Sequence, residues 1–302
     1  MARLIDEKSV KRVSPLPEWF RQELPDMEKI RKMKSMFRNS GLFTVCESAK
    51  CPNIGTCWGQ GVATFMILGE ICTRACRFCA VRAGRPPEID PDEPHQVALA
   101  VRSLNLRYVV ITSVARDDIE DEGSEQFCET IRRIRALMPS TKIEVLIPDF
   151  SNKSDSIKKL VDAHPEVVSH NIESVERLSE AIRPQASYRR SLDVLRNFKK
   201  HDPRIFVKSS IMVGLGESRS EIRESMKDLL SVRCDILTIG QYLRPTPQKR
   251  HLPVERYYTP EEFKELKEEG LALGFTYVMS GPLVRSSFIA EEGYKECLSR
   301  HN

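Results

Sequence analysis

Six cysteines gather in one short stretch of the chain, CESAKCPNIGTCWGQGVATFMILGEICTRACRFC, residues 46–79. They fall into two sets of three, spaced CxxxxCxxxxxC and CxxxCxxC: Cys46, Cys51, Cys57 and Cys72, Cys76, Cys79. Thiolates bind soft metals and iron–sulfur clusters, but structural zinc is closed by four protein ligands. No histidine follows the second set at zinc-finger spacing. Three thiolates on a four-iron cluster leave one iron open for a small molecule, and we favour this interpretation over a zinc knuckle.

The other three cysteines stand alone, at Cys128, Cys234 and Cys297. An odd total of nine makes a poor disulfide framework, so we expect these three to be small buried hydrophobes. The first twenty residues lack the apolar stretch of a signal peptide, and their acidic residues are unlike a transit peptide. These features predict a cytoplasmic protein whose thiols stay reduced.

Composition excludes two classes of partner. The chain has 302 residues, of which 40% are hydrophobic and 30% charged, with no apolar run of the roughly 18 residues that a membrane helix needs. Its net charge of +4 arises in residues 1–40, which hold ten Lys and Arg against six Asp and Glu. This basic arm is explained by a solvated helix over residues 27–39, and no strongly basic balance favours nucleic acid. We therefore expect neither a membrane nor a nucleic-acid partner.

The elements that position the cysteines are predicted by hydrophobic periodicity. Six short apolar runs predict strands, at 62–69, 108–114, 143–150, 167–174, 206–216 and 236–243. Amphipathic stretches between them predict helices, at 95–105, 124–138, 156–164, 191–201 and 220–231. Repeated βα units imply a parallel sheet covered by helices. Because polar residues follow every strand, we favour a partial (βα)6 TIM-like barrel over a doubly wound sheet.

Three parts follow from this pattern. Residues 1–61 form an amino-terminal extension with the first cysteine set, 62–275 form the barrel, and 276–302 form a carboxy-terminal segment. A last helix at 260–274 and a short strand at 276–281 lead into a tail. The second cysteine set comes directly after the first barrel strand, where loops lie on the catalytic face of a βα barrel.

CxxxCxxC in this position resembles the radical S-adenosylmethionine (SAM) superfamily. The resemblance implies that Cys72, Cys76 and Cys79 hold a [4Fe-4S] cluster whose open iron chelates S-adenosyl-L-methionine. One electron then cleaves the bound molecule, and a 5′-deoxyadenosyl radical removes hydrogen from an unactivated carbon. The cofactor performs the difficult chemistry, and the protein orients it and excludes water.

The two sets together resemble the lipoyl synthase family. Further segments match in order from about Pro17 to Phe288, namely CPNIGTCW, ATFMILG, CTRACRFCAV, VVITSVARDD, IEVLIPDF, MVGLGE, DILTIGQYL and SGPLVRSS. The family implies a second, auxiliary [4Fe-4S] cluster on Cys46, Cys51 and Cys57, with a serine of an RSSY motif as fourth ligand. Here the motif is RSSF, so the aromatic ring stays and a hydroxyl is lost. We expect Ser287 to be the ligand, with Ser286 as the alternative; two serines in a turn or N-cap would look the same.

The function implied is insertion of two sulfur atoms, at C6 and C8, into an octanoyl group on a lysine of a lipoyl-carrier domain or H protein. The auxiliary cluster is the sulfur donor. Further partners implied are an electron donor of the ferredoxin or flavodoxin type and a carrier that repairs the cluster. A methylthiotransferase is the alternative within radical chemistry, although its extra domains exceed this length. A zinc module that binds nucleic acid is the alternative from another class.

Residues at the strand ends are the expected contacts to SAM. Asn171 and Glu173, two apart on a strand, face the same way and suit ribose hydroxyls. The superfamily resemblance further points to the carboxylates after the second strand, to two glycines that permit close backbone approach, and to the end of the sixth strand. These residues are Asp117, Asp118, Gly214, Gly216, Gln241 and Tyr242. Without the resemblance, each is better explained as a plain loop or capping residue.

Overall fold

The computed structural model describes residues 16–22, 26–59 and 63–301. Its main sheet has eight strands in the order β1-β2-β5-β6-β7-β8-β9-β10. The strands are β1 Phe43–Thr44, β2 Thr64–Ile67, β5 Tyr108–Ser113, β6 Lys142–Leu146, β7 Val167–Ser169, β8 Phe206–Val213, β9 Ile236–Gln241 and β10 Tyr277–Gly281. All neighbours pair in parallel except β1 and β2.

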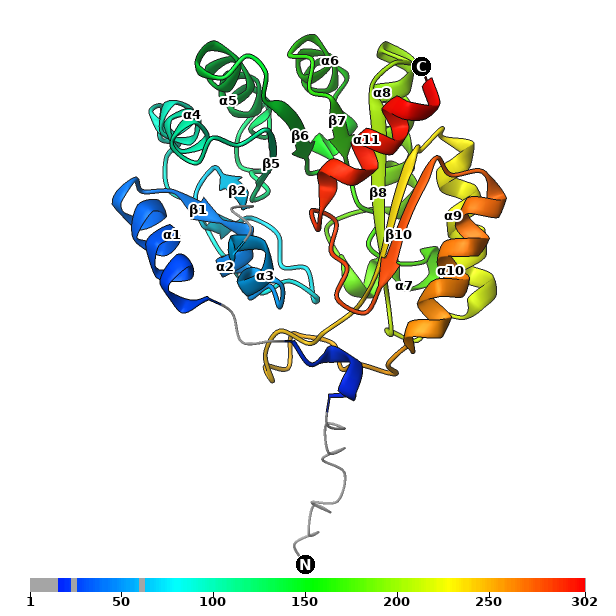
Figure 1. Cartoon of the computed structure of the whole chain (residues 1–302). Helices are drawn as coiled ribbons and strands as arrows, with labels where there is room; N and C mark the ends of the chain where they lie inside the picture. The colour runs from blue at the N-terminus through cyan, green and yellow to red at the C-terminus, as the bar shows by residue number, and fades with distance from the viewer. Residues whose placement is uncertain (1–15, 23–25, 60–62, 302) are drawn as a thin grey trace, which may run out of the picture.

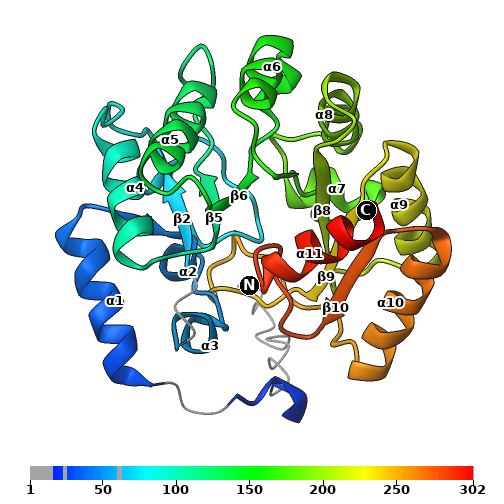
Figure 2. The ribbon, with the colours of Figure 1, turned by 45° about the horizontal axis from the view of Figure 1, so that its top comes forward.

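The strand order follows the chain order without a switch point, as in a barrel and unlike a doubly wound sheet. The two ends of the sheet are not paired with each other, so the barrel is partial. Helices ring its outer face (Figure 1 and Figure 2). They are α4 Glu93–Ser103, α5 Ser124–Leu137, α6 Ser154–Asp162, α7 Glu176–Ile182, α8 Tyr188–His201, α9 Arg219–Ser231 and α10 Pro260–Leu273. The predicted partial barrel is confirmed.

Local signals explain where several helices begin. Ser218 and Glu221 form a reciprocal capping box at the start of α9, and Thr259 and Glu262 form another at the start of α10. Ser187 caps α8 by accepting a hydrogen bond from the backbone of Arg190. Each cap fixes where the preceding loop ends, so the loops at the strand ends have defined lengths.

Three predicted strands were too long at their carboxyl ends by three residues or more. The run at 143–150 leaves the sheet after Leu146, the run at 167–174 after Ser169, and the run at 206–216 after Val213. Glu173 has φ 66° and Gly214 has φ 103°, which are left-handed conformations that a strand does not contain. The residues expected on these strand ends therefore lie in loops, with one isolated bridge from Glu173 to Ile211.

The segment expected as a carboxy-terminal tail contains α11, Ala290–His301. Its Tyr294 packs against Tyr108 and Phe206, with ring centroids 5.9 and 6.0 Å apart. These two residues begin β5 and β8, so α11 covers the amino-terminal ends of the strands. The opposite end, where the carboxyl termini of the strands lie, is the face available for chemistry.

The amino-terminal part adds the helices α1 Met27–Asn39, α2 Val45–Ser48 and α3 Ile54–Gly59, and the short turn η1 Glu18–Phe20. The predicted helix at 27–39 is confirmed. Phe37 packs on Trp58 and Phe65 at 5.5 and 5.6 Å, so this part shares the hydrophobic core of the barrel. The expected boundary at residues 61 and 62 falls outside the described residues, and the three-part division stays a prediction. Within the described part, no helix has both the length and the apolar character needed to cross a bilayer.

Candidate active site

The first cysteine set lies on α2, α3 and the turn that joins them. Cys46 is in α2 and Cys57 in α3, while the backbone N–H of Cys51 donates to the carbonyl of Cys46 at 3.0 Å. Thr44 caps α2 through the N–H of Glu47, which fixes the start of this turn of helix. Local backbone hydrogen bonds therefore bring together three cysteines that are spread over twelve positions in the sequence.

Burial raises the pKa of all three thiols, to about 11 for Cys46 and about 12 for Cys57. The neighbouring thiols add to the effect, since Cys51 raises the pKa of Cys46, and both raise that of Cys57. The buried indole N–H of Trp58 lies beside Cys46 and lowers the pKa of the thiol as a hydrogen-bond donor. A donor next to sulfur suits a thiolate ligand.

The second set lies in the loop that follows β2, around a small pair of strands, β3 Ile71–Cys72 and β4 Arg82–Ala83. The Cys72 sulfur accepts the backbone N–H groups of Arg74 and Ala115, at 3.4 and 3.3 Å. Burial raises the pKa of Cys76 to about 12 and that of Cys79 to about 11, and the neighbouring thiols raise both further. The three sulfurs therefore lie within electrostatic reach of one another.

The number of donors suits a cluster better than a single ion. A structural zinc site takes four protein ligands, and each set offers three thiols. Among residues 16–22, 26–59 and 63–301, no three His, Cys, Asp or Glu side chains are arranged to hold one ion. A four-iron cluster takes each protein ligand on a separate iron, so a set of three gathered thiols suits it. Burial raises the pKa of five of the six thiols, so metal binding must displace protons from them.

A buried arginine fixes the second loop. Arg74 donates from NH2 to Asp149 at 2.7 Å and from Nε to Asp117 at 3.0 Å. Asp149 is fully buried and also accepts from Arg190 at 2.7 Å. Burial opposes ionisation of Asp149, yet the hydrogen bond and charge of Arg74 lower its pKa to about 2. Asp117, predicted as a SAM contact, is thus bound to the loop itself, and the half-exposed Asp118 pairs with Arg116.

Gln185, in the connection between α7 and α8, holds the same loop. Its Oε1 accepts the N–H of Ala75 at 2.7 Å, and its Nε2 donates to the carbonyl of Thr73 at 3.3 Å. The N–H of Arg77 donates to the carbonyl of Ile182 at 2.8 Å. No spacing in the sequence marks Gln185, because its partners lie more than 100 positions away.

Asn171 and Glu173 lie together beside the second set, as the sequence predicted, although in a loop. Asn171 donates from Nδ2 to Glu173 at 3.1 Å, and its Oδ1 is buried without a partner among the described atoms. Burial raises the pKa of Glu173, and its charge raises the pKa of Cys76. An unpaired buried acceptor next to a carboxylate fits a ligand that carries hydroxyl groups.

Arg183 is a cation near this set that sequence reasoning missed. It is 5% exposed and donates to the carbonyl of Asn171 at 3.0 Å. Burial lowers its pKa, while Glu173 and Cys76 raise it. A buried positive charge at this place favours the thiolate form of Cys76.

The glycines and the end of β9 are packed against the following loop. A Cβ on Gly214 would lie 2.0 Å from Nε2 of Gln241, so only glycine fits there. Gly216, with φ 100°, completes the same turn. Gln241 donates to the carbonyl of Arg256 and accepts from Tyr258, and Tyr242 donates from its hydroxyl to Leu252 at 2.8 Å. These side chains are bound within the protein, and their predicted contact to SAM remains untested.

The carboxy-terminal motif lies next to the first set. Asn53 donates to the carbonyl of Leu283 at 2.6 Å, and the charge of Arg285 lowers the pKa of Cys51. Ser286 and Ser287 lie in a turn that ends before α11, so neither is its N-cap. Neither hydroxyl makes a hydrogen bond with another residue that the structure describes. The N-cap form of the alternative is therefore wrong and its turn form is confirmed, and the role of either serine as a ligand stays a prediction.

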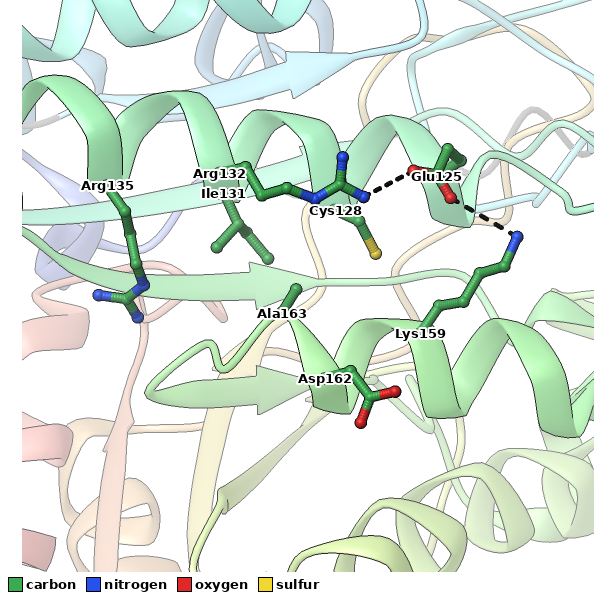
Figure 3. Close-up of a pocket in the computed structure, with 8 residues that line it drawn as sticks. All are labelled: Glu125, Cys128, Ile131, Arg132, Arg135, Lys159, Asp162 and Ala163. Atoms are coloured by element: carbon green, nitrogen blue, oxygen red, sulfur yellow. Dashed lines mark hydrogen bonds and ion pairs between the residues drawn. The ribbon is translucent and has the colours of Figure 1, made fainter.

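Other buried residues lie away from the two sets. His170 is buried with both ring nitrogens bonded, to Ile147 and Ser191. Cys128, Cys234 and Cys297 are buried as predicted. A hollow of about 440 Å³ lies on the outside of the barrel between α5 and α6. Figure 3 shows Cys128 beside the Arg132–Glu125–Lys159 ion pairs that line it, and no residue of the two sets lines it.

Comparison with known proteins identifies the family. Residues 66–229 match the Radical SAM superfamily, which implies a [4Fe-4S] cluster and SAM as cofactors. Solved structures share the fold: a methylornithine synthase, 14% identical, covers 88% of this chain and 81% of its own with a TM-score of 0.53. A maturase of the [FeFe]-hydrogenase, 12% identical, covers 76% and 61% with a TM-score of 0.55.

Sequence relatives are much closer. Lipoyl synthase of Rubrobacter xylanophilus is 54% identical over 276 residues, covering 91% of this chain and 85% of that protein. The lipoyl synthase of Symbiobacterium thermophilum is 52% identical, covering 95% and 89%, and that of Caldicellulosiruptor saccharolyticus is 50% identical, covering 92% and 97%. The chain belongs to the lipoyl synthase family of radical SAM enzymes.

Proposed function

We propose that this protein inserts two sulfur atoms, at C6 and C8, into an octanoyl group carried on a lysine of a lipoyl-carrier domain or H protein. The observation that supports this most is the meeting of two segments more than 200 positions apart. Asn53, between two cysteines of the first set, binds Leu283, just before Arg285, Ser286 and Ser287. A cluster that is consumed as the sulfur donor needs a second set of thiolates and a ligand that can be released, such as a nearby hydroxyl. A radical enzyme with a single cluster does not need a second set of thiolates.

Cys72, Cys76 and Cys79 would hold the first [4Fe-4S] cluster. With SAM bound, it supplies a 5′-deoxyadenosyl radical that removes hydrogen from an unactivated carbon. The protein keeps this loop rigid through Arg74 and Gln185. Two backbone N–H groups donate to the Cys72 sulfur and hold it in place.

Cys46, Cys51 and Cys57 would hold the auxiliary [4Fe-4S] cluster, which supplies the sulfur. Ser287 is the proposed fourth ligand, with Ser286 as the alternative. A serine oxygen is a hard ligand beside three soft thiolates, so it is the weakest link to iron and the first to leave. Phe288 replaces the family's tyrosine without affecting either hydroxyl.

SAM would be held by the strand-end loops. Asn171 and Glu173 offer a buried oxygen and a carboxylate for the ribose. Asp117 and Asp118 would lie near the methionyl group of SAM. The backbone at Gly214 would lie near the adenine, and Gly216, Gln241 and Tyr242 would complete that side of the binding site. An electron donor of the ferredoxin or flavodoxin type and a cluster-repair carrier are the further proposed partners.

The test is sulfur insertion into an octanoylated carrier. Anaerobically reconstituted protein is incubated with the carrier, SAM and dithionite, and the products are measured by mass spectrometry. We expect the carrier to gain two sulfur atoms and 5′-deoxyadenosine to form. The variant with Cys46, Cys51 and Cys57 changed to alanine should still release 5′-deoxyadenosine but insert no sulfur. The Cys128→Ala protein should behave as wild type. Cleavage of SAM by the wild type without any sulfur gain would disprove the proposal.

A further inference from the structure

Six cations without carboxylate partners surround the second cysteine set. They lie on two loop segments, 77–85 and 244–250, and we call them the basic loop surface: Arg77, Arg82, Arg85, Arg244, Lys249 and Arg250. Neither segment contains an Asp or Glu. Within the described part of the chain, none of the six makes an ion pair, whereas neighbouring cations such as Arg74 and Arg256 do. Arg82, Arg85 and Lys249 are exposed.

The two segments form one surface because backbone and side chain join them. The N–H of Leu252 donates to the carbonyl of Arg77 at 3.2 Å, and Nε of Arg77 donates back to the carbonyl of Arg250 at 3.3 Å. Tyr242 holds Leu252 through its hydroxyl and packs in a cluster with Phe78. The second segment belongs to the gold loop that follows β9 in Figure 1. Like charges are thus gathered on two joined segments that contain no carboxylate, which favours the approach of an acidic group.

This surface is connected directly to a predicted cluster ligand. His251 follows Arg250, is 1% exposed, and binds the carbonyl of Cys79 through Nε2 at 2.9 Å. Its Nδ1 bonds Thr246 at 2.7 Å, so both ring nitrogens are fixed. An acidic protein docked here would lie one side chain away from the second set.

We propose that the basic loop surface is the docking site for a small acidic one-electron carrier of the flavodoxin type. The inference rests on the proposed function, because a cluster on Cys72, Cys76 and Cys79 must be reduced before SAM is cleaved. One electron leaves the reduced carrier, which is oxidised, and enters the cluster, which is reduced; no bond forms or breaks. Electrostatic complementarity of this kind steers association and sets its dependence on salt.

The position of the surface argues for an electron carrier over the octanoylated carrier. Sulfur insertion needs the substrate next to the first set, whose surroundings include Leu283 and Arg285. The two segments of the basic loop surface bind one another and also Ala181, Ile182 and Leu252, and the adjoining His251 binds Cys79. Among the described residues, no hydrogen bond joins these segments to Cys46, Cys51 or Cys57. Electron transfer, in contrast, requires only that the carrier docks close to the cluster held by the second set.

The experiment compares two variants of the reconstituted holoenzyme with the same change in net charge. The first carries Arg82→Glu, Arg85→Glu and Lys249→Glu; the control carries Lys158→Glu, Lys200→Glu and Lys267→Glu, which are exposed on α6, α8 and α10. Affinity for a photoreduced flavodoxin is measured by titration at two salt concentrations, and affinity for the octanoylated carrier is measured alongside. Iron content and the EPR signal after dithionite report whether each variant holds its clusters.

We expect the Kd for flavodoxin to rise at least about tenfold in the first variant and less than about twofold in the control. Added salt should weaken wild-type binding and have little effect on the first variant. Unchanged flavodoxin affinity in the first variant overturns the proposal, as does a loss confined to the octanoylated carrier. Failure of the proposed function looks different, because the wild type would then insert no sulfur even with dithionite.

Discussion

Asn53 and Leu283 are joined by a 2.6 Å hydrogen bond that spans 230 positions of the chain. It connects the loop of the first cysteine set to the turn that holds Ser286 and Ser287. A Cβ on Gly240 would lie 2.0 Å from the carbonyl oxygen of Val284, so the segment also crosses β9 in close contact. The fourth ligand of the proposed auxiliary cluster is therefore positioned by contacts outside the motif itself.

Asn53→Ala should weaken the first set selectively. Removing the amide leaves the Leu283 carbonyl without its partner, which costs about 1–3 kcal/mol where the group is buried. We expect reconstituted protein to lose iron from the auxiliary cluster and to insert sulfur at least about tenfold more slowly, with SAM cleavage close to wild type. Asn39→Ala, on the exposed end of α1, is the control. Equal loss of both activities would mean that Asn53 supports the whole fold instead.

The two serines can be separated by substitution. Ser287→Ala should lower sulfur insertion by about a hundredfold or more, since the cluster loses its releasable ligand, while Ser286→Ala retains most activity. Ser287→Cys supplies a softer ligand that binds iron more tightly, so we expect a stable auxiliary cluster and slow insertion. Iron analysis and product mass spectrometry measure both effects. The opposite ranking of the two alanine variants would assign the ligand to Ser286.

Asp149→Asn should loosen the loop of the second set. The substitution removes the charge that pairs with the buried Arg74 and with Arg190, and breaking such a pair costs about 3 kcal/mol. We expect lower unfolding stability and about a tenfold slower release of 5′-deoxyadenosine. Asp193→Asn breaks an exposed pair with Arg196 and should change stability by less than about 1 kcal/mol. Identical effects of the two substitutions would contradict a positioning role for Asp149.

Because His170 is buried, we expect the folded protein to lose stability in mild acid. Burial lowers its pKa from 6.5 to about 4, so the unfolded chain takes up a proton before the folded protein does. The contribution of neutral His170 to the free energy of unfolding is complete above pH 6.5, and it is lost as the pH falls from 6.5 towards 4. Between pH 7.5 and 5.5 it amounts to about 1.4 kcal/mol. His170→Asn should reduce the pH dependence of the urea midpoint by this amount, and His201→Asn, on the exposed end of α8, should leave it unchanged.

The sequence predicted those parts of the site that are local along the chain. Each cysteine set lies within a short segment of the chain, and its spacing alone predicts that its members gather. Asn171 and Glu173 were correctly paired, although the left-handed φ of Glu173 places them in a loop. The barrel was predicted because each strand buries a continuous apolar run.

What the sequence did not predict depends on distant contacts. Gln185 reaches Thr73 across 112 positions, and Asp149 reaches Arg74 across 75. The side-chain amide of Gln241 binds Arg256 and Tyr258 in the loop after β9, 15 and 17 positions further along the chain. Such pairings follow from the closure of the barrel, and no local pattern of residues encodes them.

The central claim is that sulfide held by Cys46, Cys51 and Cys57 becomes the sulfur of the product. Protein reconstituted with 34S sulfide is freed of excess sulfide and given octanoylated carrier, SAM and reductant for a single turnover. We predict that both inserted sulfur atoms are 34S by mass spectrometry, with the iron content falling from about eight towards four. A product that carries only sulfur of natural abundance, or labelled product from the variant with Cys46, Cys51 and Cys57 changed to alanine, would contradict the account.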